Sequence, residues 1–362
     1  MTSPGRAGRS WSSRLRELRI IARAALDVRR PLLAQIIPMR RCNLACGYCN
    51  EYDHHSPPVP AEVMFERIDL LAAMGTAVVT ISGGEPLLHP ELEAIIRRIH
   101  DRGMVVTLIT NGLLLGPDRI KALNAVRLDR LQISIDNLRP DGVSKKSLMV
   151  LDRKLVMLAE HAAFDVNVNC VLGSGVENPD DALTIARRAR ELGFTATMGI
   201  IHDGDGHLKP LLGRSREVYD AFRDLTRWSI TRLNRTFQNR LARGLPNDWR
   251  CRAGSRYLYV CEDGLVHDCS QRRGTPAIPL ARYTLSHRRK AHMTQKPCAP
   301  YCTISCVHQA SSFDRWRGAQ RPGVVLNSPS LAQTQARASE TTPRGAMGAL
   351  GFRPREEGTP PR

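Results

Sequence analysis

The chain has 362 residues, of which 42% are apolar, and it carries a formal net charge of +18. The apolar content supplies a core for one large domain or two of ordinary size, and it excludes a wholly disordered chain. The sequence contains no run of about 18 apolar residues and no signal-peptide pattern, so we expect a cytoplasmic protein with neither a transmembrane helix nor a secretion signal.

The positive charge comes almost entirely from arginine, because only seven of the 53 basic residues are lysine. No nucleic-acid-binding motif accompanies the charge, so we do not expect a nucleic-acid partner.

Residues 1–32 form a basic N-terminal segment in which a helix is expected over residues 10–30. This helix would carry Leu15, Leu18, Ile21 and Ala25 on one side. Two interpretations stay open. The helix packs on the main domain, which we favour, or it is a peripheral membrane helix that touches anionic lipid.

From residue 33 to about residue 198, segments typical of strands and helices alternate. The expected strands cover residues 33–39, 77–82, 105–110, 130–135, 166–172 and 195–201, and the expected helices cover residues 61–74, 90–102, 117 onward, 144–161 and 179–192. Such alternation predicts an α/β fold with a parallel sheet and right-handed crossovers. About six units favour a partial (β/α)6 barrel of the TIM type, to which we assign residues 33–245. In such barrels the chemistry gathers at the carboxyl ends of the strands.

The sequence changes in character after Trp249. A hairpin is expected to turn at Asp263-Gly264, and loops rich in Cys and Pro follow it, so we assign residues 250–312 to a small Cys-rich module. Residues 320–362 are rich in Pro, Gly, Arg and Thr without periodicity, which predicts a disordered tail.

Three cysteines, Cys42, Cys46 and Cys49, follow directly on the first expected strand. Ten cysteines are many for a cytoplasmic chain, where thiols usually indicate metal binding or catalysis. Three inert buried thiols are one interpretation, but Asn43 and Gly47 suit a ligand loop better. Three thiolates that converge in a short loop suit an iron–sulfur cluster or zinc, with one coordination position left open for catalysis.

The order of motifs along the chain resembles the radical S-adenosylmethionine (radical SAM) superfamily. The CxxxCxxC loop contains an aromatic residue at Tyr48, and Gly83-Gly84-Glu85-Pro86 after the second strand resembles the GGEP motif of that superfamily. Further matches lie at the ends of the following strands, in Thr110-Asn111-Gly112, Ser134-Ile135-Asp136 and Asn169. The resemblance covers about residues 33–200.

This resemblance implies a cofactor and its ligands. The three thiolates would bind three irons of a 4Fe–4S cluster, and S-adenosylmethionine (SAM) would chelate the fourth iron. Gly83 and Gly84 would let the backbone approach the methionine part of SAM closely. Glu85 would accept hydrogen bonds from the ammonium group of SAM.

The resemblance also implies contacts to the rest of the cofactor. Tyr48 would lie beside the adenine. Contacts to the ribose or carboxylate are implied for three residues that could equally be satisfied polar groups of the barrel mouth: Ser134, Asp136 and Asn169. Cys170 should alternate to the other face of its strand and be a buried core thiol.

The C-terminal cysteines form a second pattern. Twelve residues, Gly264 and four more residues separate Cys251 from Cys269, which resembles the opening of the auxiliary-cluster module called SPASM or its shortened form, twitch. The later cysteines depart from the longer SPASM pattern. We therefore predict one auxiliary 4Fe–4S cluster, ligated by Cys251, Cys269 and two or three of Cys298, Cys302 and Cys306. Cys261 is the weakest candidate, and zinc bound by the same ligands is the alternative.

The resemblance implies a radical SAM enzyme. Reductive cleavage of SAM would give a 5′-deoxyadenosyl radical that abstracts hydrogen from the substrate, with electrons from a reducing partner such as ferredoxin or flavodoxin. The substrate stays open between a peptide or protein and a small molecule or lipid. A non-catalytic iron–sulfur or zinc protein with a regulatory or scaffold function is the alternative, and Glu85 with its two preceding glycines argues against it.

Overall fold

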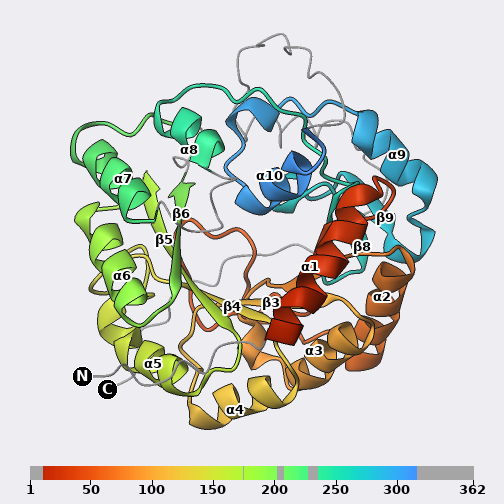
Figure 1. Cartoon of the computed structure of the whole chain (residues 1–362), viewed down its shortest axis with the longest axis horizontal. Coiled ribbons are helices and arrows are strands. Elements are labelled where there is room, and N and C mark those ends of the chain that lie inside the picture. The colour runs from red at the N-terminus through yellow and green to blue at the C-terminus, as the bar shows by residue number, and fades with distance from the viewer. Residues whose placement is uncertain (1–10, 174, 202–207, 227–234, 316–362) are drawn as a thin grey trace, which may run out of the picture.

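The computed structural model describes residues 11–173, 175–201, 208–226 and 235–315. Six parallel strands form the barrel: β1 (Leu33–Ile36), β2 (Val78–Ile81), β3 (Val105–Thr110), β4 (Arg130–Ser134), β5 (Asp165–Gly173) and β6 (Thr195–Ile201). Helices lie between successive strands: α2 (Ala61–Ala73), α3 (Leu92–Asp101), α4 (Pro117–Ala125), α5 (Leu148–His161) and α6 (Asp180–Glu191). These helices form an arc around the outer side of the strands (Figure 1), which confirms the predicted α/β partial barrel. The tail predicted over residues 320–362 lies outside the described residues.

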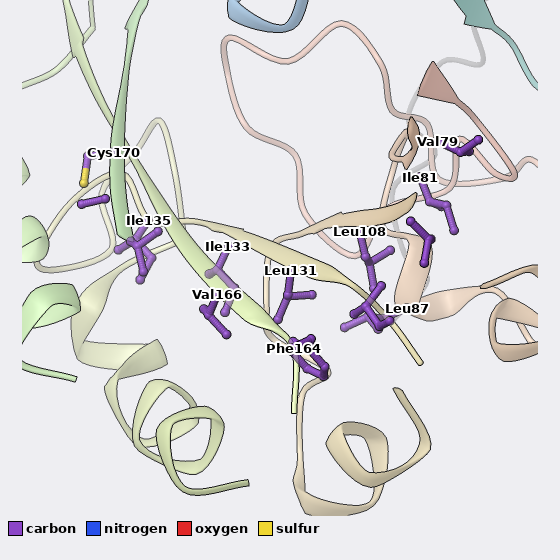
Figure 2. Close-up of a cluster of buried hydrophobic side chains, with 14 of the residues drawn as sticks. Val79, Ile81, Leu87, Leu108, Leu131, Ile133, Ile135, Phe164, Val166 and Cys170 are labelled. Atoms are coloured by element: carbon purple, nitrogen blue, oxygen red, sulfur yellow. The ribbon is translucent and has the colours of Figure 1, made fainter. Parts of the chain in front are cut away.

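The two faces of the barrel strands differ in polarity. The outward side chains are apolar and pack between the strands and the helices, as Figure 2 shows for Ile81, Leu108 and Ile133. Side chains alternate along a strand, so the residues between these face the barrel interior. Many of them carry hydroxyl or amide groups, namely Gln35, Thr80, Thr107, Gln132, Asn167, Asn169 and Thr197, whereas Val105, Ile109 and Val171 on the same faces are apolar. The barrel interior therefore offers neutral hydrogen-bonding groups.

The residues after Trp249 continue the barrel sheet. Strand β7 (Tyr257–Val260) pairs in parallel with β1, and β8 (Leu265–His267) and β9 (Pro276–Pro279) follow it as antiparallel neighbours. The remaining described helices are α7 (Gly213–Leu225), α8 (Arg235–Ala242), α9 (Leu285–Met293) and α10 (Ser305–Ser312). Residues 250–312, predicted as a small module, thus share one sheet with the barrel.

Helix α1 (Trp11–Leu26) packs against the amino-terminal ends of the barrel strands. Arg16 Nη2 lies 2.9 Å from Asp129 Oδ2, and Glu17 forms an ion pair with Arg130 at the start of β4. Glu17 is buried, whereas Leu15 and Leu18 of the predicted apolar side are exposed. Leu15 and Leu18 of the expected apolar side therefore face outward, whereas Ala25 of the same set packs against the core. Ion pairs of Arg16 and Glu17 hold the opposite side of the helix on the barrel. None of the described helices is both long and apolar enough to span a bilayer.

Candidate functional site

The CxxxCxxC loop lies at the carboxyl end of β1, and backbone hydrogen bonds fix it to two neighbouring segments. Cys42 N donates to Asp53 O at 2.9 Å, and Gly47 N donates to Val143 O at 3.0 Å. The loop is therefore supported by the segment that follows it and by the loop after β4. All ten cysteines of the chain are free thiols.

The three thiols of this loop share one region with Glu85. The pKa of Cys42 is raised to about 11, chiefly by burial, with smaller contributions from the neighbouring Glu85, Cys49 and Cys46, while the hydrogen bond from Leu44 N lowers it. Burial also raises the pKa of Cys49. Thiolates are the metal-binding form of cysteine, so these groups need a nearby positive charge such as an iron ion to ionise.

Gly83 and Gly84 are required by a close approach of two backbone segments. Gly83 has a φ of +123°, and a Cβ on it would lie 2.5 Å from Met39 O. A Cβ on Gly84 would lie 2.1 Å from Arg40 O and 2.3 Å from Arg41 O. These glycines pack the loop after β2 directly on the segment that leads into Cys42. The two glycines are therefore needed for this packing of one loop on the other, a reason that the motif alone does not indicate.

Glu85 is fully buried and joins the ends of β2 and β3. Its Oε1 accepts hydrogen bonds from Thr110 Oγ1 at 2.7 Å and Leu87 N at 2.9 Å, and its Oε2 accepts one from Asn111 N at 2.8 Å. Burial raises the pKa of Glu85, and the Asn111 and Thr110 hydrogen bonds counteract that rise. A contact of Glu85 with a ligand ammonium group stays a prediction.

Tyr48, Asp136 and Lys146 form a compact polar group beside the cysteine loop. The Tyr48 hydroxyl donates to Asp136 Oδ2 at 2.5 Å, Lys146 Nζ lies 3.0 Å from the same oxygen, and Lys146 also donates to the Tyr48 hydroxyl. Burial would lower the pKa of Lys146, but the Asp136 carboxylate and Tyr48 outweigh it and raise this pKa above its usual value. Asp136 Oδ1 is buried without a hydrogen-bond partner among the described residues.

Lys146 was missed by the sequence analysis. The side chain is 10% exposed, and its ammonium group contacts both Tyr48 and Asp136, which are predicted cofactor residues. The sequence did offer one indication of Lys146. Lysine is rare in this chain, with seven in all, and this one lies in the loop after the carboxyl end of β4.

Ser134 and Asn169 are neighbours on the inner faces of β4 and β5. The two residues pair directly across the strands, and Asn169 Oδ1 accepts a hydrogen bond from Thr197 Oγ1 at 3.0 Å. They lie on the strands that lead toward Asp136. Cys170 is fully buried in the outer apolar core, as predicted.

Four of the C-terminal thiols lie close together. The pKa of Cys302 is raised well above its usual value, first by burial and then by neighbouring thiols. These neighbours are Cys251, Cys269 and Cys298. The pKa of Cys269 is raised by burial and then by Cys251 and Cys298. The four thiols therefore lie near one another, with Cys251 and Cys269 buried and Cys298 and Cys302 half-buried.

Cys261 and Cys306 pack in the same cluster of buried side chains as Cys251 and Cys269, but their sulfur atoms make other contacts. Cys306 Sγ points to the barrel residue Gln35, 3.8 Å from its Oε1, which also accepts a hydrogen bond from Tyr257 at 2.7 Å. Cys261 lies with Asp263 and His267, all three ligand atoms falling within 4.8 Å of one another. The spacing of the sequence could not separate Cys306 from Cys302, because both follow Cys298 at regular intervals.

Comparison with known proteins identifies a family match in the central part of the chain. The sequence model described as the Radical SAM superfamily matches residues 36–209, which contain the cysteine loop, the glycine pair and Glu85. Residues 36–209 of this chain belong to the radical SAM superfamily. The residues predicted to bind the first cluster and SAM therefore lie in the matched part of the chain, whereas the C-terminal cysteines lie after it.

Two curated radical SAM relatives match parts of the chain. GTP 3',8-cyclase of Aquifex aeolicus is 32% identical over 187 residues, which are 46% of this chain and 57% of that protein. PqqA peptide cyclase of Ruegeria pomeroyi is 38% identical over 104 residues, 28% of each chain. The chain thus spans less than two thirds of either relative.

A solved structure supports the fold. Streptococcus suis SuiB bound to the precursor peptide SuiA has a TM-score of 0.53 at 14% identity, covering 89% of this chain and 74% of that chain. At this identity the likeness concerns the fold alone.

Proposed function

We propose that this chain is a radical SAM enzyme whose Cys42, Cys46 and Cys49 hold a 4Fe–4S cluster that binds SAM. The observation that carries the proposal is the grouping of three thiols with Glu85 at the carboxyl end of β1 and β2. Three thiolates leave one iron of a four-iron cluster without a protein ligand, which is where a cofactor can bind.

The residues around the thiols fit such a cofactor. Asp136 Oδ1 is a buried acceptor without a partner among the described residues, so it can receive a hydrogen bond from a bound ligand. Lys146 carries a positive charge beside it, which suits a carboxylate. When bound, the cluster and SAM supply a 5′-deoxyadenosyl radical by reductive cleavage of the sulfur–carbon bond.

The protein itself contributes position and exclusion of water. The Glu85 carboxylate joins the ends of β2 and β3 through its hydrogen bonds. It thereby holds the loop that carries Gly83 and Gly84 in place. Lys146 and Asp136 hold the Tyr48 ring through its hydroxyl, and Tyr48 is 39% exposed at the barrel mouth. A ligand at this mouth would meet a ring and a lysine that are already oriented.

We propose a second, auxiliary 4Fe–4S cluster ligated by Cys251, Cys269, Cys298 and Cys302, with Cys306 left out. Zinc would draw its sulfur ligands to about 3.8 Å from one another, given a Zn–S distance of about 2.3 Å. Among the described residues, no three of these sulfurs lie within 4.8 Å of one another, which supports a cluster in preference to zinc. Four thiolates leave no open iron, so the cluster would carry electrons or support the fold.

Substrate, reductant and location belong to the same proposal. The named activities of the two relatives divide between a nucleotide and a peptide, and the neutral polar barrel interior favours a substrate rich in hydroxyl or amide groups. A ferredoxin or flavodoxin would supply electrons. Ten free thiols support a reducing compartment such as the cytoplasm, with a peripheral membrane contact through α1.

The experiment measures iron and SAM cleavage in the same preparations. Anaerobically reconstituted protein should hold roughly eight irons and release 5′-deoxyadenosine from SAM when a strong reductant is added. Replacing Cys42, Cys46 and Cys49 by Ala should leave about half of the iron and no cleavage. Fully loaded protein that releases no 5′-deoxyadenosine would overturn the proposed activity.

The auxiliary ligand set is tested by a matched pair of variants. Cys302→Ala should lose about half of the iron, whereas Cys306→Ala should keep roughly eight irons because its thiol faces Gln35. Equal iron loss in both variants would contradict the four-thiol assignment, and zinc in place of iron in wild-type protein would contradict the auxiliary cluster.

A further inference from the structure

The outward face of α1 carries an apolar stripe. Successive helical residues lie about 100° apart around the axis, so five positions fall within an arc of about 80°. These residues are Trp11, Leu15, Leu18, Ala22 and Leu26. Trp11 is 86% exposed, Leu18 65% and Leu26 72%. Large apolar side chains that line up on a protein surface indicate an interaction site.

The orientation of this stripe is fixed by polar contacts on the opposite side of α1. Glu17 is 5% exposed and paired with Arg130. At the end of the helix, the fully buried Arg256 donates through Nη2 to Ala24 O at 2.9 Å. Rotating the helix to bury the stripe would break these buried contacts, so the stripe faces outward in the folded protein.

Arginines flank the stripe on both sides. The same helical geometry places Arg14 on one side of it and Arg19 and Arg23 on the other. The acid within α1 is Glu17, which is buried and paired. Arg14 lies 3.9 Å from Asp165 at the start of β5, so Arg19 and Arg23 supply the positive charge beside the stripe, and α1 itself carries no exposed acid.

We infer that the stripe and its arginines bind the surface of an anionic membrane. Leucine and tryptophan beside arginine are the composition of helices that lie in the plane of a lipid surface, where apolar side chains insert and cations contact lipid phosphates. A second copy of the chain fits the stripe less well, because pairing would bring the same arginines together. The membrane contact proposed above for α1 is thereby assigned to anionic lipids and to these residues.

The position of α1 also determines how the candidate site would be oriented relative to a membrane. The helix contacts Asp129 and Arg130 at the amino-terminal end of β4, whereas the cysteine loop follows the carboxyl end of β1. On a membrane, the barrel would therefore be held by its amino-terminal end with the site facing water. This orientation of the site rests on the proposed function, whereas lipid binding by α1 does not.

The test is sedimentation of the full reconstituted chain with phosphatidylcholine vesicles that contain or lack phosphatidylglycerol. Binding should require phosphatidylglycerol and should weaken as salt rises. Changing Trp11, Leu15 and Leu18 together to Ser should weaken binding by about a hundredfold or more. Arg19→Gln with Arg23→Gln should weaken it by about fivefold for each arginine.

Matched controls separate the stripe from general surface effects. Met149→Ser removes another side chain that is 65% exposed, on α5, and Arg97→Gln with Arg153→Gln removes two exposed arginines of α3 and α5. These variants should bind as wild type does. Circular dichroism and iron content should be unchanged in all variants, which excludes misfolding as the cause of lost binding.

Three results would overturn the inference. They are equal binding to vesicles without phosphatidylglycerol, unchanged binding of the Trp11, Leu15 and Leu18 variant, and a wild-type dimer that this variant converts to a monomer. Hydrogen exchange of the vesicle-bound protein tests its orientation on the membrane. Backbone amides of residues 11–26 are expected to be protected from exchange. Protection of residues 42–49 instead would contradict the orientation, even where SAM cleavage is intact.

Discussion

Gly84→Ala tests whether the two loops of the site need their close approach. The added Cβ would lie 2.1 Å from Arg40 O and 2.3 Å from Arg41 O. The loops must therefore separate by about 1 Å or more to reach ordinary contact distances. The backbone hydrogen bonds that join them here, Gly84 N to Met39 O at 3.1 Å and Glu85 N to Arg41 O at 3.0 Å, would lengthen or break.

The expected loss of stability follows from these contacts. Each of the two hydrogen bonds contributes about 0.5–1.5 kcal/mol, and overpacking costs about 1–3 kcal/mol more. The free energy of unfolding should therefore fall by about 2–6 kcal/mol. Because Cys42 directly follows Arg41, the same displacement should reduce iron binding at the cysteine loop.

The assay compares denaturant unfolding of the iron-free protein with iron content after reconstitution. Gly142→Ala is the control, because Gly142 also lies in a loop near the site but has no atom within 4 Å of an added Cβ. It should change the free energy of unfolding by less than about 0.5 kcal/mol. Gly84→Ala protein with the stability and iron content of this control would refute the reasoning.

Two further predictions concern buried charge. Lys146→Met should destabilise the protein by about 3–5 kcal/mol, because it leaves Asp136 buried without its cation, and adding Asp136→Asn should restore part of the loss in the same unfolding assay. His89 is held neutral, with Nδ1 accepting from Glu91 N and Nε2 facing Val59 O, and burial lowers its pKa. The unfolded chain therefore binds a proton below about pH 6.5 that the folded chain does not, so stability should fall with falling pH by at most about 1.4 kcal/mol per pH unit. His89→Gln should remove that slope, and an unchanged slope would show that other groups cause it.

The sequence predicted the parts of this fold that depend on local pattern. Alternating strands and helices, the hairpin turn at Asp263-Gly264 and the cysteine loop after β1 all follow from residues close together in the chain. The packed side of α1 does not, because it is decided by Glu17 and Arg130, which lie 113 residues apart.

The site shows the same division. Tyr48 and Asp136 could be named from motifs, but Lys146 joins them only through the folded loop after β4. Cys302 and Cys306 have equal spacing in the sequence and different surroundings in the structure, since α10 places Cys306 against Gln35 of β1. Regular spacing along a chain cannot distinguish two positions that a helix turns to different neighbours.

The parallel pairing of β7 with β1 makes the family domain inseparable from the segment after it. Residues 33–36 bond to β2 on one side and to residues 257–260 on the other. A shortened chain ending near residue 245 would leave one edge of β1 with unsatisfied backbone groups, a template for intermolecular strand pairing. The part of the chain that matches the superfamily is therefore expected to aggregate when expressed without residues 250–312.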